Sequence, residues 1–276
     1  MKHKIKMIGL DLDGTLLDSK KVLTEYTRNV LQKALQQGLI VIASTGRALS
    51  AIPKELLSLQ GMKYVITANG ARVIDIQKNE VLIENTIPVE TAEHMLDIIY
   101  GYDAVKEIFV EGKCYSGKKE MEHVYDYFDN PHVAEYVLHS RTHVEDVKTV
   151  LREINHPVEK VQGVFRHMDD RTEALRRLRE IPGITITNAF GYNLEMNKEG
   201  TDKGNALLKL AETLGIKREE IMACGDGMND YAMLKMAGIA VAMENACDEL
   251  KEIADYITAT NDEDGVAKAI EKFALQ

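Results

Sequence analysis

The chain has 276 residues, with 34 Lys and Arg against 44 Asp and Glu, so its formal net charge is −10. A hydrophobic fraction of 45% is typical of a folded protein and excludes intrinsic disorder, and the length predicts two domains of ordinary size. The acidic balance argues against a nucleic-acid or anionic-membrane partner, because these partners need clustered Lys and Arg. A small phosphorylated ligand needs only a few local cations and stays compatible with this charge.

The N-terminal residues and the cysteines predict a cytoplasmic protein. Asp11 and Asp13 interrupt the first apolar run long before a signal peptide could form. No apolar stretch approaches the roughly 20 residues of a membrane-spanning helix. Cys114, Cys224 and Cys247 are an odd number of cysteines, lie far apart and form no CxxC pattern, which predicts free thiols in a reducing compartment.

The first third of the chain alternates strand and helix. Apolar runs predict strands at residues 5–10, 39–43 and 64–68, and helical spacing predicts a helix at residues 24–37 and another after residues 44–47. This rhythm is typical of a doubly wound parallel α/β sheet. Right-handed crossovers in such a sheet bring the carboxyl ends of the strands to one edge, where ligands bind.

The middle of the chain differs from both ends, and the last third returns to the first rhythm. In the middle, we expect helices at 89–100, 144–154 and 171–179 and strands at 108–110, 158–166 and 184–187. In the last third, we expect helices at 203–214, 230–237 and 265–273 and strands at 220–224 and 239–242. The predicted organisation is therefore a core formed by residues 1–83 and 191–276, with an α+β domain inserted at residues 84–190.

Two carboxylates follow the first predicted strand, in the segment Asp11-Leu12-Asp13-Gly14-Thr15-Leu16-Leu17-Asp18. At positions i and i+2 they can point to the same side of the sheet. One carboxylate could attack phosphorus as a nucleophile, while the other protonates the leaving oxygen. The alternative interpretation is a polar turn that merely ends a strand.

Two further polar segments carry groups that suit an anion. Ser44-Thr45-Gly46-Arg47 offers a hydroxyl and backbone N–H groups at a predicted helix start, although an ordinary helix cap would look the same. Lys203, in Thr201-Asp202-Lys203-Gly204, stands at a helix start, where a cation is unusual by dipole logic. A carboxylate and a phosphate nearby would explain this lysine; a solvated surface lysine is the alternative.

The fourth segment is Gly225-Asp226-Gly227-Met228-Asn229-Asp230, again after an apolar strand. Carboxylates at this edge favour Mg²⁺, which prefers carboxylates, waters and phosphate oxygens, whereas a simple turn also favours Asp, Gly and Asn. Together the four segments supply a nucleophile, an acid, a phosphate clamp, a cation and a metal site. This combination predicts Mg²⁺-dependent phosphoryl transfer.

The order DLDGTLLD, STGR, TDKG and GDGMND resembles the haloacid dehalogenase (HAD) superfamily of phosphatases. Asn69-Gly70 after the third strand, the inserted domain and the closing Asp264-Gly265-Val266 resemble its Cof-type subfamily with a large α/β cap. The resemblance implies a Rossmann-like core and an inserted cap that selects the substrate.

The resemblance also implies roles for single residues. Asp11 would be the nucleophile and Asp13 the general acid and base. Mg²⁺ would be held by Asp11, the Asp13 backbone carbonyl and Asp226, with Asp230 in support. The residues that would bind the phosphoryl group or line the substrate entrance are Thr45, Gly46, Arg47, Asn69, Lys203 and Asn229.

The function predicted in this way is a Mg²⁺-dependent phosphatase that acts on a small phosphorylated metabolite through an aspartyl-phosphate. A sugar phosphate or a phosphorylated cofactor is the expected substrate. A phosphomutase is the alternative enzyme, and a non-catalytic ligand-sensing protein on the same fold is the alternative of another class.

Overall fold

A computed structural model describes residues 4–188 and 191–275 and divides into two compact units. Unit 1 comprises Met1–Gly46, Ile52–Ile83 and Asp202–Gln276, and unit 2 comprises Arg47–Ala51 and Glu84–Thr201. The division before the inserted segment lies between Ile83 and Glu84. At the other end, residues 191–201 group with unit 2 rather than with the core, because the strand at Asn193–Lys198 pairs inside the sheet of unit 2.

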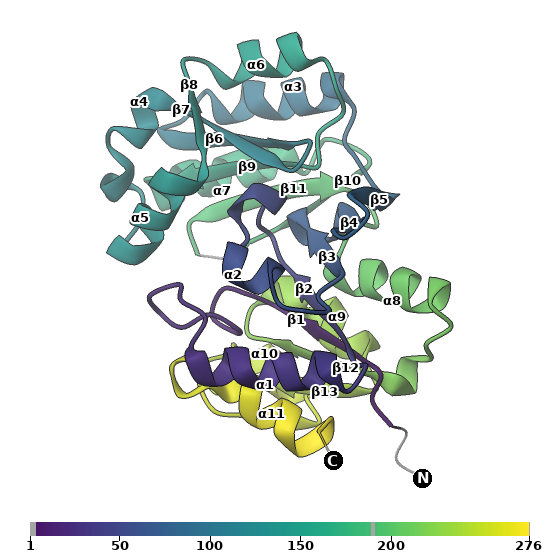
Figure 1. Ribbon diagram of the computed structural model, residues 1–276. Coiled ribbons are helices and arrows are strands. Elements are labelled where there is room, and N and C mark those ends of the chain that lie inside the picture. The colour runs from purple at the N-terminus through teal and green to yellow at the C-terminus, as the bar shows by residue number, and fades with distance from the viewer. Residues whose placement is uncertain (1–3, 189–190, 276) are drawn as a thin grey trace. The chain divides into compact units, whose positions relative to one another are not determined.

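Unit 1 contains a mixed sheet with the strand order β14-β13-β12-β1-β2-β3-β4-β5 within the described residues (Figure 1). The strands from β14 to β3 run parallel, and β4 turns back antiparallel to β3. The central strand β1 lies between β12 and β2, so the carboxyl ends of these three strands meet at one edge of the sheet. The strands are β1 Met7–Leu10, β2 Ile40–Ser44, β3 Tyr64–Thr67, β4 Arg72–Asp75, β5 Glu80–Glu84, β12 Ile221–Gly225, β13 Ile239–Ala242 and β14 Tyr256–Ile257.

Helices cover this sheet on both faces. A Cβ on Gly9 of β1 would lie 2.7 Å from the Leu207 side chain of α8 and 3.4 Å from the Met233 side chain of α9, so both helices approach the sheet closely at this glycine. On the other side α1 and α11 lie side by side (Figure 1), joined by the hydrogen bond from Tyr26 to Glu271. The helices are α1 Glu25–Gln36, α2 Lys54–Leu57, α8 Lys203–Thr213, α9 Tyr231–Met236, α10 Asp248–Ile253 and α11 Gly265–Phe273.

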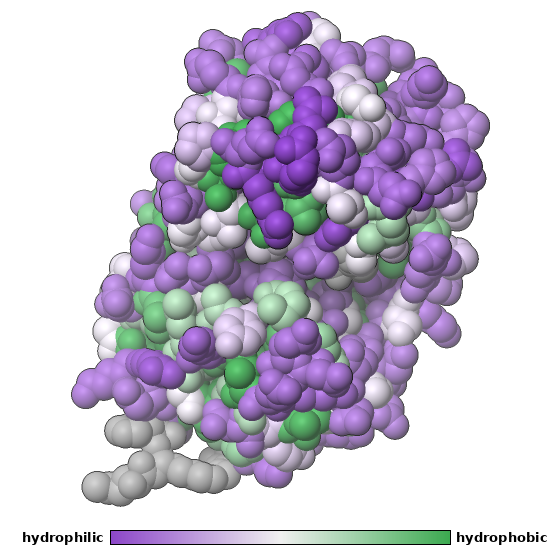
Figure 2. All heavy atoms as spheres, turned by 180° about the vertical axis from the view of Figure 1, so that it is seen from behind, coloured by the Kyte–Doolittle hydropathy of each residue, from purple (hydrophilic) through white to green (hydrophobic). Residues whose placement is uncertain are grey.

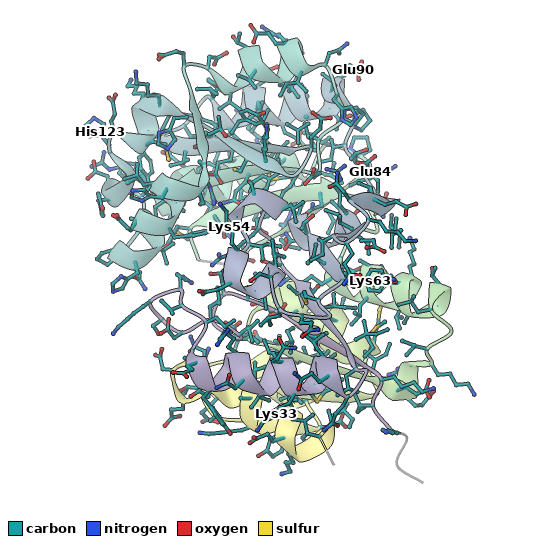
Figure 3. All side chains as sticks on the ribbon, viewed as in Figure 1. Lys33, Lys54, Lys63, Glu84, Glu90 and His123 are labelled. Atoms are coloured by element: carbon teal, nitrogen blue, oxygen red, sulfur yellow. The ribbon has the colours of Figure 1, made fainter. Side chains whose placement is uncertain are left out.

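Helix α1 shows how the sequence specifies these elements. Thr24 caps its N-terminus by accepting a hydrogen bond from the Thr27 backbone N–H, and Val30 and Ala34, one turn apart, are both buried. Lys33 lies on the opposite, exposed side of the helix (Figure 3). Helix formation here follows from the apolar stripe that the sheet buries.

Unit 2 contains its own sheet, with the strand order β10-β11-β9-β6-β7-β8 among the described residues. All its pairs are antiparallel except β7 with β8, which is parallel. The strands are β6 Ala104–Val110, β7 Lys113–Gly117, β8 Thr142–Val144, β9 Lys160–Phe165, β10 Ile184–Thr187 and β11 Asn193–Lys198.

One face of this second sheet is apolar and packs against helices α3, α6 and α7, with residues such as Ile108, Val161 and Met196 in the shared core. The helices of unit 2 are α3 Val89–Ile99, α4 Lys118–Met121, α5 Pro131–Ser140, α6 Val147–Ile154 and α7 Met168–Leu178. The helix expected at 144–154 begins only at Val147, because Asp146 caps it and the residues just before belong to β8.

The predicted fold class, a doubly wound α/β core with an inserted α+β domain, is confirmed. The helix expected directly after residues 44–47 is replaced by a single 3-10 turn at Leu49–Ala51 and the short α2, because Pro53 interrupts any continuous helix. None of the described helices has the length and apolarity that crossing a bilayer requires. On the face drawn in Figure 2, hydrophobic side chains are scattered among hydrophilic ones.

Candidate active site

Asp11 follows β1 directly, and its side chain is almost completely buried. Its backbone N–H donates to the Cys224 carbonyl of the neighbouring strand β12 at 3.1 Å, and its carbonyl accepts from the Leu16 N–H at 3.2 Å. The parallel sheet on one side and a tight loop on the other therefore fix the backbone that carries this carboxylate.

The loop after β1 is locked against the turn after β12. Gly14 adopts a positive φ of 84°, and a Cβ there would lie 2.3 Å from Asp226 Oδ2, so only glycine fits. The next residue, Thr15, donates its hydroxyl to Asp226 Oδ1 at 2.6 Å. Thr15 is a site residue that the sequence-based reasoning did not single out, although it stands inside the first polar segment.

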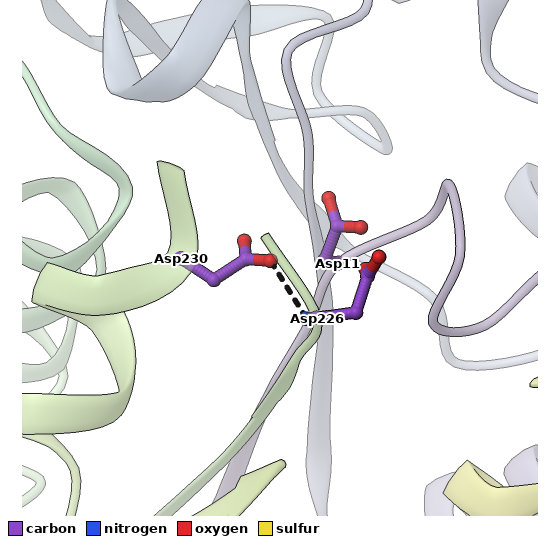
Figure 4. A group of neighbouring side chains, drawn as sticks. All are labelled: Asp11, Asp226 and Asp230. Atoms are coloured by element: carbon purple, nitrogen blue, oxygen red, sulfur yellow. Dashed lines mark hydrogen bonds between the residues drawn. The ribbon is translucent and has the colours of Figure 1, made fainter. Parts of the chain in front are cut away.

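The turn after β12 is organised by Asp230. Its Oδ2 accepts from the backbone N–H of Asp226 at 3.0 Å and of Gly227 at 3.1 Å. Figure 4 shows the first of these bonds, with Asp11 beside the pair. Asp230 is fully buried, so its carboxylate orients the turn from inside and leaves the Asp226 side chain facing Asp11.

Lys203 joins two of these acids. It stands at the first position of α8, whose N-cap is Asp202, and its side chain is completely buried. Its ammonium donates to Asp11 Oδ1 and to Asp230 Oδ1, each at 2.6 Å. Burial alone would lower the pKa of Lys203, but the attraction of the two carboxylates outweighs burial and raises this pKa above its ordinary value.

Burial has the opposite effect on the acids. It raises the pKa of Asp11 well above the ordinary value, and the negative charge of Asp230 raises it further, against the opposing effect of Lys203. Burial and the same neighbour raise the pKa of Asp226 to about 7. One ammonium therefore does not neutralise the cluster, and a further cation is needed to keep these acids ionised at neutral pH.

The donor set suits a divalent cation. Asp11, Asp226 and Asp230 each place an oxygen within 4.8 Å of the others, and the three residues come from the carboxyl ends of two adjacent strands. Carboxylate oxygens at this spacing are the ligands that Mg²⁺ prefers, usually with waters and a phosphate oxygen. The carboxylate of Asp13, a residue predicted to bind the metal only through its backbone carbonyl, is not part of this group of side chains.

Asp13 lies two residues beyond Asp11 and is partly exposed. Its Oδ1 is 2.8 Å from the ammonium of Lys21, a residue on the turn that follows. Lys21 is the second residue that sequence reasoning missed, because no helical or strand spacing relates it to Asp13.

Thr45, Gly46 and Asn69 lie on adjacent strand ends of unit 1. Thr45 follows β2, and its N–H donates to the Ile66 carbonyl of β3 at 2.9 Å. The Asn69 N–H donates in turn to the Thr45 carbonyl at 3.0 Å, and Asn69 adopts a left-handed φ of 60° that asparagine tolerates. The structure thus brings Asn69 directly beside Thr45, and Gly46 follows at the end of the same segment.

Arg47, the last residue of the second polar segment, groups with unit 2 rather than with unit 1. Its guanidinium donates to the Ala51 carbonyl at 2.9 Å and lies 4.0 Å from the centre of the Tyr136 ring. Arg47 therefore belongs to a different body from Thr45 and Gly46, which precede it directly. Asn229 lies half-buried in the 3-10 turn Met228–Asp230, between the two acids of the fourth segment.

The comparisons with known proteins agree with this geometry. A family model described as haloacid dehalogenase-like hydrolase matches residues 8–270, which is nearly the whole chain. The chain belongs to the haloacid dehalogenase-like hydrolase family. The predicted resemblance to this superfamily is confirmed, and so is the predicted class of enzyme, a phosphatase.

Several relatives of this family are similar along their full length. The 5-amino-6-(5-phospho-D-ribitylamino)uracil phosphatase YcsE of Bacillus subtilis is 34% identical over 274 residues, covering 98% of this chain and 96% of that protein. A solved haloacid dehalogenase-like hydrolase from Bacteroides thetaiotaomicron is 32% identical, with a TM-score of 0.82 over 98% of this chain and 99% of that one. The solved HAD subclass IIB sugar phosphatase BT4131 is 27% identical, with a TM-score of 0.81 over 97% and 98% of the two chains.

Proposed function

We propose that this phosphatase hydrolyses the phosphomonoester of a small metabolite through an aspartyl-phosphate formed on Asp11, with Mg²⁺ as its cofactor. The observation that carries the proposal is the group of Asp11, Asp226 and Asp230, in which the buried Asp11 and Asp230 share the Lys203 ammonium and Asp226 adds a third carboxylate. Such a group is costly to bury unless it binds a cation and a reacting anion.

In the first half-reaction, an oxygen of the Asp11 carboxylate attacks phosphorus, and the bond from phosphorus to the leaving oxygen breaks. Asp13 gives its proton to that leaving oxygen, so the product departs as a neutral alcohol. Lys203 remains hydrogen-bonded to Asp11 and offsets part of the negative charge that the phosphoryl oxygens bring. The backbone of Thr45 and Gly46, with the Thr45 hydroxyl, would bind those oxygens, and Asn229 would contact them from the other segment.

In the second half-reaction, water attacks the phosphorus of the aspartyl-phosphate. Asp13, now a carboxylate, takes the proton of that water, and the bond between phosphorus and the Asp11 oxygen breaks. Inorganic phosphate leaves, and Asp11 and Asp13 return to their starting states. One acid thus serves in both directions, while its neighbour is the nucleophile.

Mg²⁺ would be held by Asp11, Asp226, Asp230 and the Asp13 backbone carbonyl. When bound, it supplies positive charge that offsets the repulsion between these acids and the phosphate dianion. The raised pKa values of Asp11 and Asp226 support this assignment, because the acids need such a charge to be ionised near pH 7.

We infer that unit 2 is the cap that selects the substrate, and that Arg47 and Asn69 line the substrate entrance. The relatives support a substrate in which a phosphate is attached to a sugar or a ribityl chain, since their names specify a sugar phosphatase and a phosphoribitylamino-uracil phosphatase. The acidic net charge favours such small molecules over nucleic acid. A cytoplasmic location stays a prediction.

The experiment is a screen of phosphorylated metabolites, including sugar phosphates and phosphorylated ribityl compounds, with phosphate release measured with Mg²⁺ and with EDTA. The proposal expects hydrolysis of one chemical group of substrates that stops with EDTA and returns with added Mg²⁺. Release that persists undiminished in EDTA would contradict the metal, and no release from any monoester would contradict the activity.

A further inference from the structure

Lys21 forms an ion pair with Asp13 that the proposed mechanism does not yet use. Its Nζ lies 2.8 Å from Asp13 Oδ1, and the two side chains are only 14% and 25% exposed. Both residues belong to unit 1 and are eight positions apart along one loop. A pair this well shielded from water holds its geometry better than an exposed one does.

The backbone of Lys21 adopts a left-handed conformation that is unusual for lysine. Its φ is 65°, in the region that normally favours glycine. The Asp18 side chain stabilises this turn, because its Oδ1 accepts from the N–H groups of Lys20 at 2.9 Å and of Val22 at 2.8 Å. The Lys21 N–H donates to the Asp18 carbonyl at 2.9 Å. The turn therefore fixes the direction in which the Lys21 side chain leaves the backbone.

The same turn is attached to a second segment of unit 1. The Ser19 N–H and hydroxyl donate to the two oxygens of Asp262, at 2.8 and 2.6 Å. Asn261, which precedes Asp262 in the chain, donates a hydrogen bond from its side-chain amide to the Leu17 carbonyl at 2.9 Å. Lys21 is thus presented from a braced turn rather than from a loose loop, which is what a positioning residue requires.

The charges of the site divide between two lysines. Lys203 is bonded to Asp11 and Asp230, and these acids lie with Asp226 in the group that suits a metal ion. The Asp13 carboxylate is outside that group and has Lys21 beside it. Asp11 and Asp13, which are separated by one residue, therefore contact different lysines: Asp11 contacts Lys203 and Asp13 contacts Lys21.

We propose that Lys21 is a positioning residue that holds the Asp13 carboxyl group in the orientation for proton transfer and away from the metal-binding carboxylates. This inference rests on the proposed function, in which Asp13 protonates the leaving oxygen. Without Lys21, the Asp13 carboxyl group loses the ion pair that orients it, and the proton donor is less well aligned with the leaving group.

The test compares two substrates of the same shape that differ in their need for a proton. p-Nitrophenolate is a good leaving group without protonation, whereas the more basic phenolate of phenyl phosphate leaves better when protonated. The value of kcat/KM reports on the steps up to departure of this group, so later hydrolysis of the phospho-enzyme does not affect it. The variants are Lys21→Met, Lys21→Arg and, as a matched control on the same turn, Lys20→Met.

We expect Lys21→Met to lower kcat/KM for phenyl phosphate by roughly 10- to 100-fold, because small misplacement of a catalytic group costs up to about 10² in rate. The loss of kcat/KM for p-nitrophenyl phosphate should be less than about threefold, because p-nitrophenolate leaves without being protonated. Lys21→Arg keeps the charge and should restore most of the rate on phenyl phosphate. Lys20→Met should match the wild type on both substrates.

A double-mutant comparison makes the result independent of folding. In an Asp13→Asn background, Lys21→Met should cause no further difference between the two substrates, because the group that it positions is gone. Equal losses on both substrates would overturn the proposal and assign Lys21 to phosphate binding or to folding. Unchanged rates on both would overturn it as well.

The outcome for Asp13 separates this proposal from the function on which it rests. If Asp13→Asn itself lowers both rates equally, the role of Asp13 as proton donor fails. If Asp13→Asn discriminates between the substrates and Lys21→Met does not, only the positioning role fails.

Discussion

The two units contain buried charges that are arranged in opposite ways. In unit 2 two buried cations are each paired with a carboxylate: Arg141 donates to Glu107 at 2.8 Å, and Lys160 donates to Glu195 at 3.1 Å. In unit 1 Asp11 and Asp230 share the ammonium of Lys203, and Asp226 adds a third carboxylate to the same group.

The difference separates a structural arrangement from a reactive one. A balanced pair satisfies its own charges and holds a sheet together, whereas an excess of buried carboxylates stores unfavourable energy until a cation binds. The pKa of Arg141 follows the first pattern, because the attraction of Glu107 outweighs burial and raises it. The pKa of Asp11 follows the second pattern, since burial and Asp230 raise it despite Lys203.

The largest expected effect is on catalysis at the unbalanced cluster. Asp11→Asn should abolish turnover of p-nitrophenyl phosphate, because the amide cannot form the phospho-enzyme. It should not destabilise the metal-free protein, since it removes one of the repelling carboxylates. Steady-state kinetics and thermal unfolding in EDTA measure the two results.

Asp75→Asn is the matched control, because Asp75 is likewise buried in unit 1, while its carboxylate accepts hydrogen bonds from the backbone of Gln77 and Lys78 rather than from Lys203. This variant should keep kcat while it lowers the free energy of unfolding. Turnover by Asp11→Asn at the wild-type rate would disprove the nucleophilic role.

The next effect concerns Asp13, which is neither in the cluster nor fully buried. Asp13→Asn should slow turnover by roughly 10²–10⁴-fold, the usual contribution of a general acid and base. The affinity for Mg²⁺ should stay close to that of the wild type, because the asparagine keeps the backbone carbonyl. Steady-state kinetics measure the turnover rate, and a calorimetric Mg²⁺ titration of the same preparation measures the affinity. Turnover at the wild-type rate would show that Asp13 takes no part in proton transfer.

Removing one partner of a balanced ion pair in unit 2 should lower the free energy of unfolding. Glu107→Gln removes the carboxylate and leaves the Arg141 guanidinium buried without its counter-charge, which typically costs about 3–5 kcal/mol of folding free energy. The double variant Glu107→Gln, Arg141→Met should recover part of this loss. Urea unfolding measures both. A single variant as stable as the wild type would show that this ion pair does not stabilise the fold.

The smallest effect is a pH dependence. The pKa of Asp226 is raised from 3.8 to about 7, so between these values the folded state binds more protons than the unfolded state. The free energy of unfolding of the metal-free protein should therefore fall as the pH rises through this window. Mg²⁺ should stabilise the protein more at pH 8 than at pH 5, because it binds the ionised acids.

The contribution of Asp226 to this pH dependence is obtained by comparing the wild type with the Asp226→Asn variant. Thermal unfolding of the wild type and of Asp226→Asn, each in EDTA from pH 4 to 8, should diverge in slope, with the flatter profile for the variant. Parallel profiles would mean that Asp226 titrates as an exposed acid does.

Much of the fold and the core of the site follow from the sequence. Apolar runs that end in Asp11, Ser44 and Gly225 predict adjacent parallel strands, and parallel strands place their carboxyl ends together. This is why Asp11 and Asp226 could be assigned to one site across more than 200 residues of chain.

Other features depend on contacts that no local pattern encodes. Strand β5 has mostly exposed residues, so it lacks the apolar alternation that identifies a strand. Lys21 contacts Asp13 because Asp18 and Asp262 stabilise a turn in which Lys21 has a left-handed backbone. Lysine rarely adopts a positive φ, so the sequence does not predict this conformation. Arg47 groups with unit 2 and stacks on Tyr136, a contact between residues far apart in sequence.

The most direct test of the central claim is a crystal structure of the protein with Mg²⁺ and beryllium fluoride, a mimic of a phosphoryl group on a carboxylate. We predict beryllium bonded to an oxygen of Asp11, with the Mg²⁺ ion bound by Asp11 and Asp226 and with Lys203 beside the fluorides. Beryllium fluoride on another side chain, or Mg²⁺ bound away from these acids, would contradict the account.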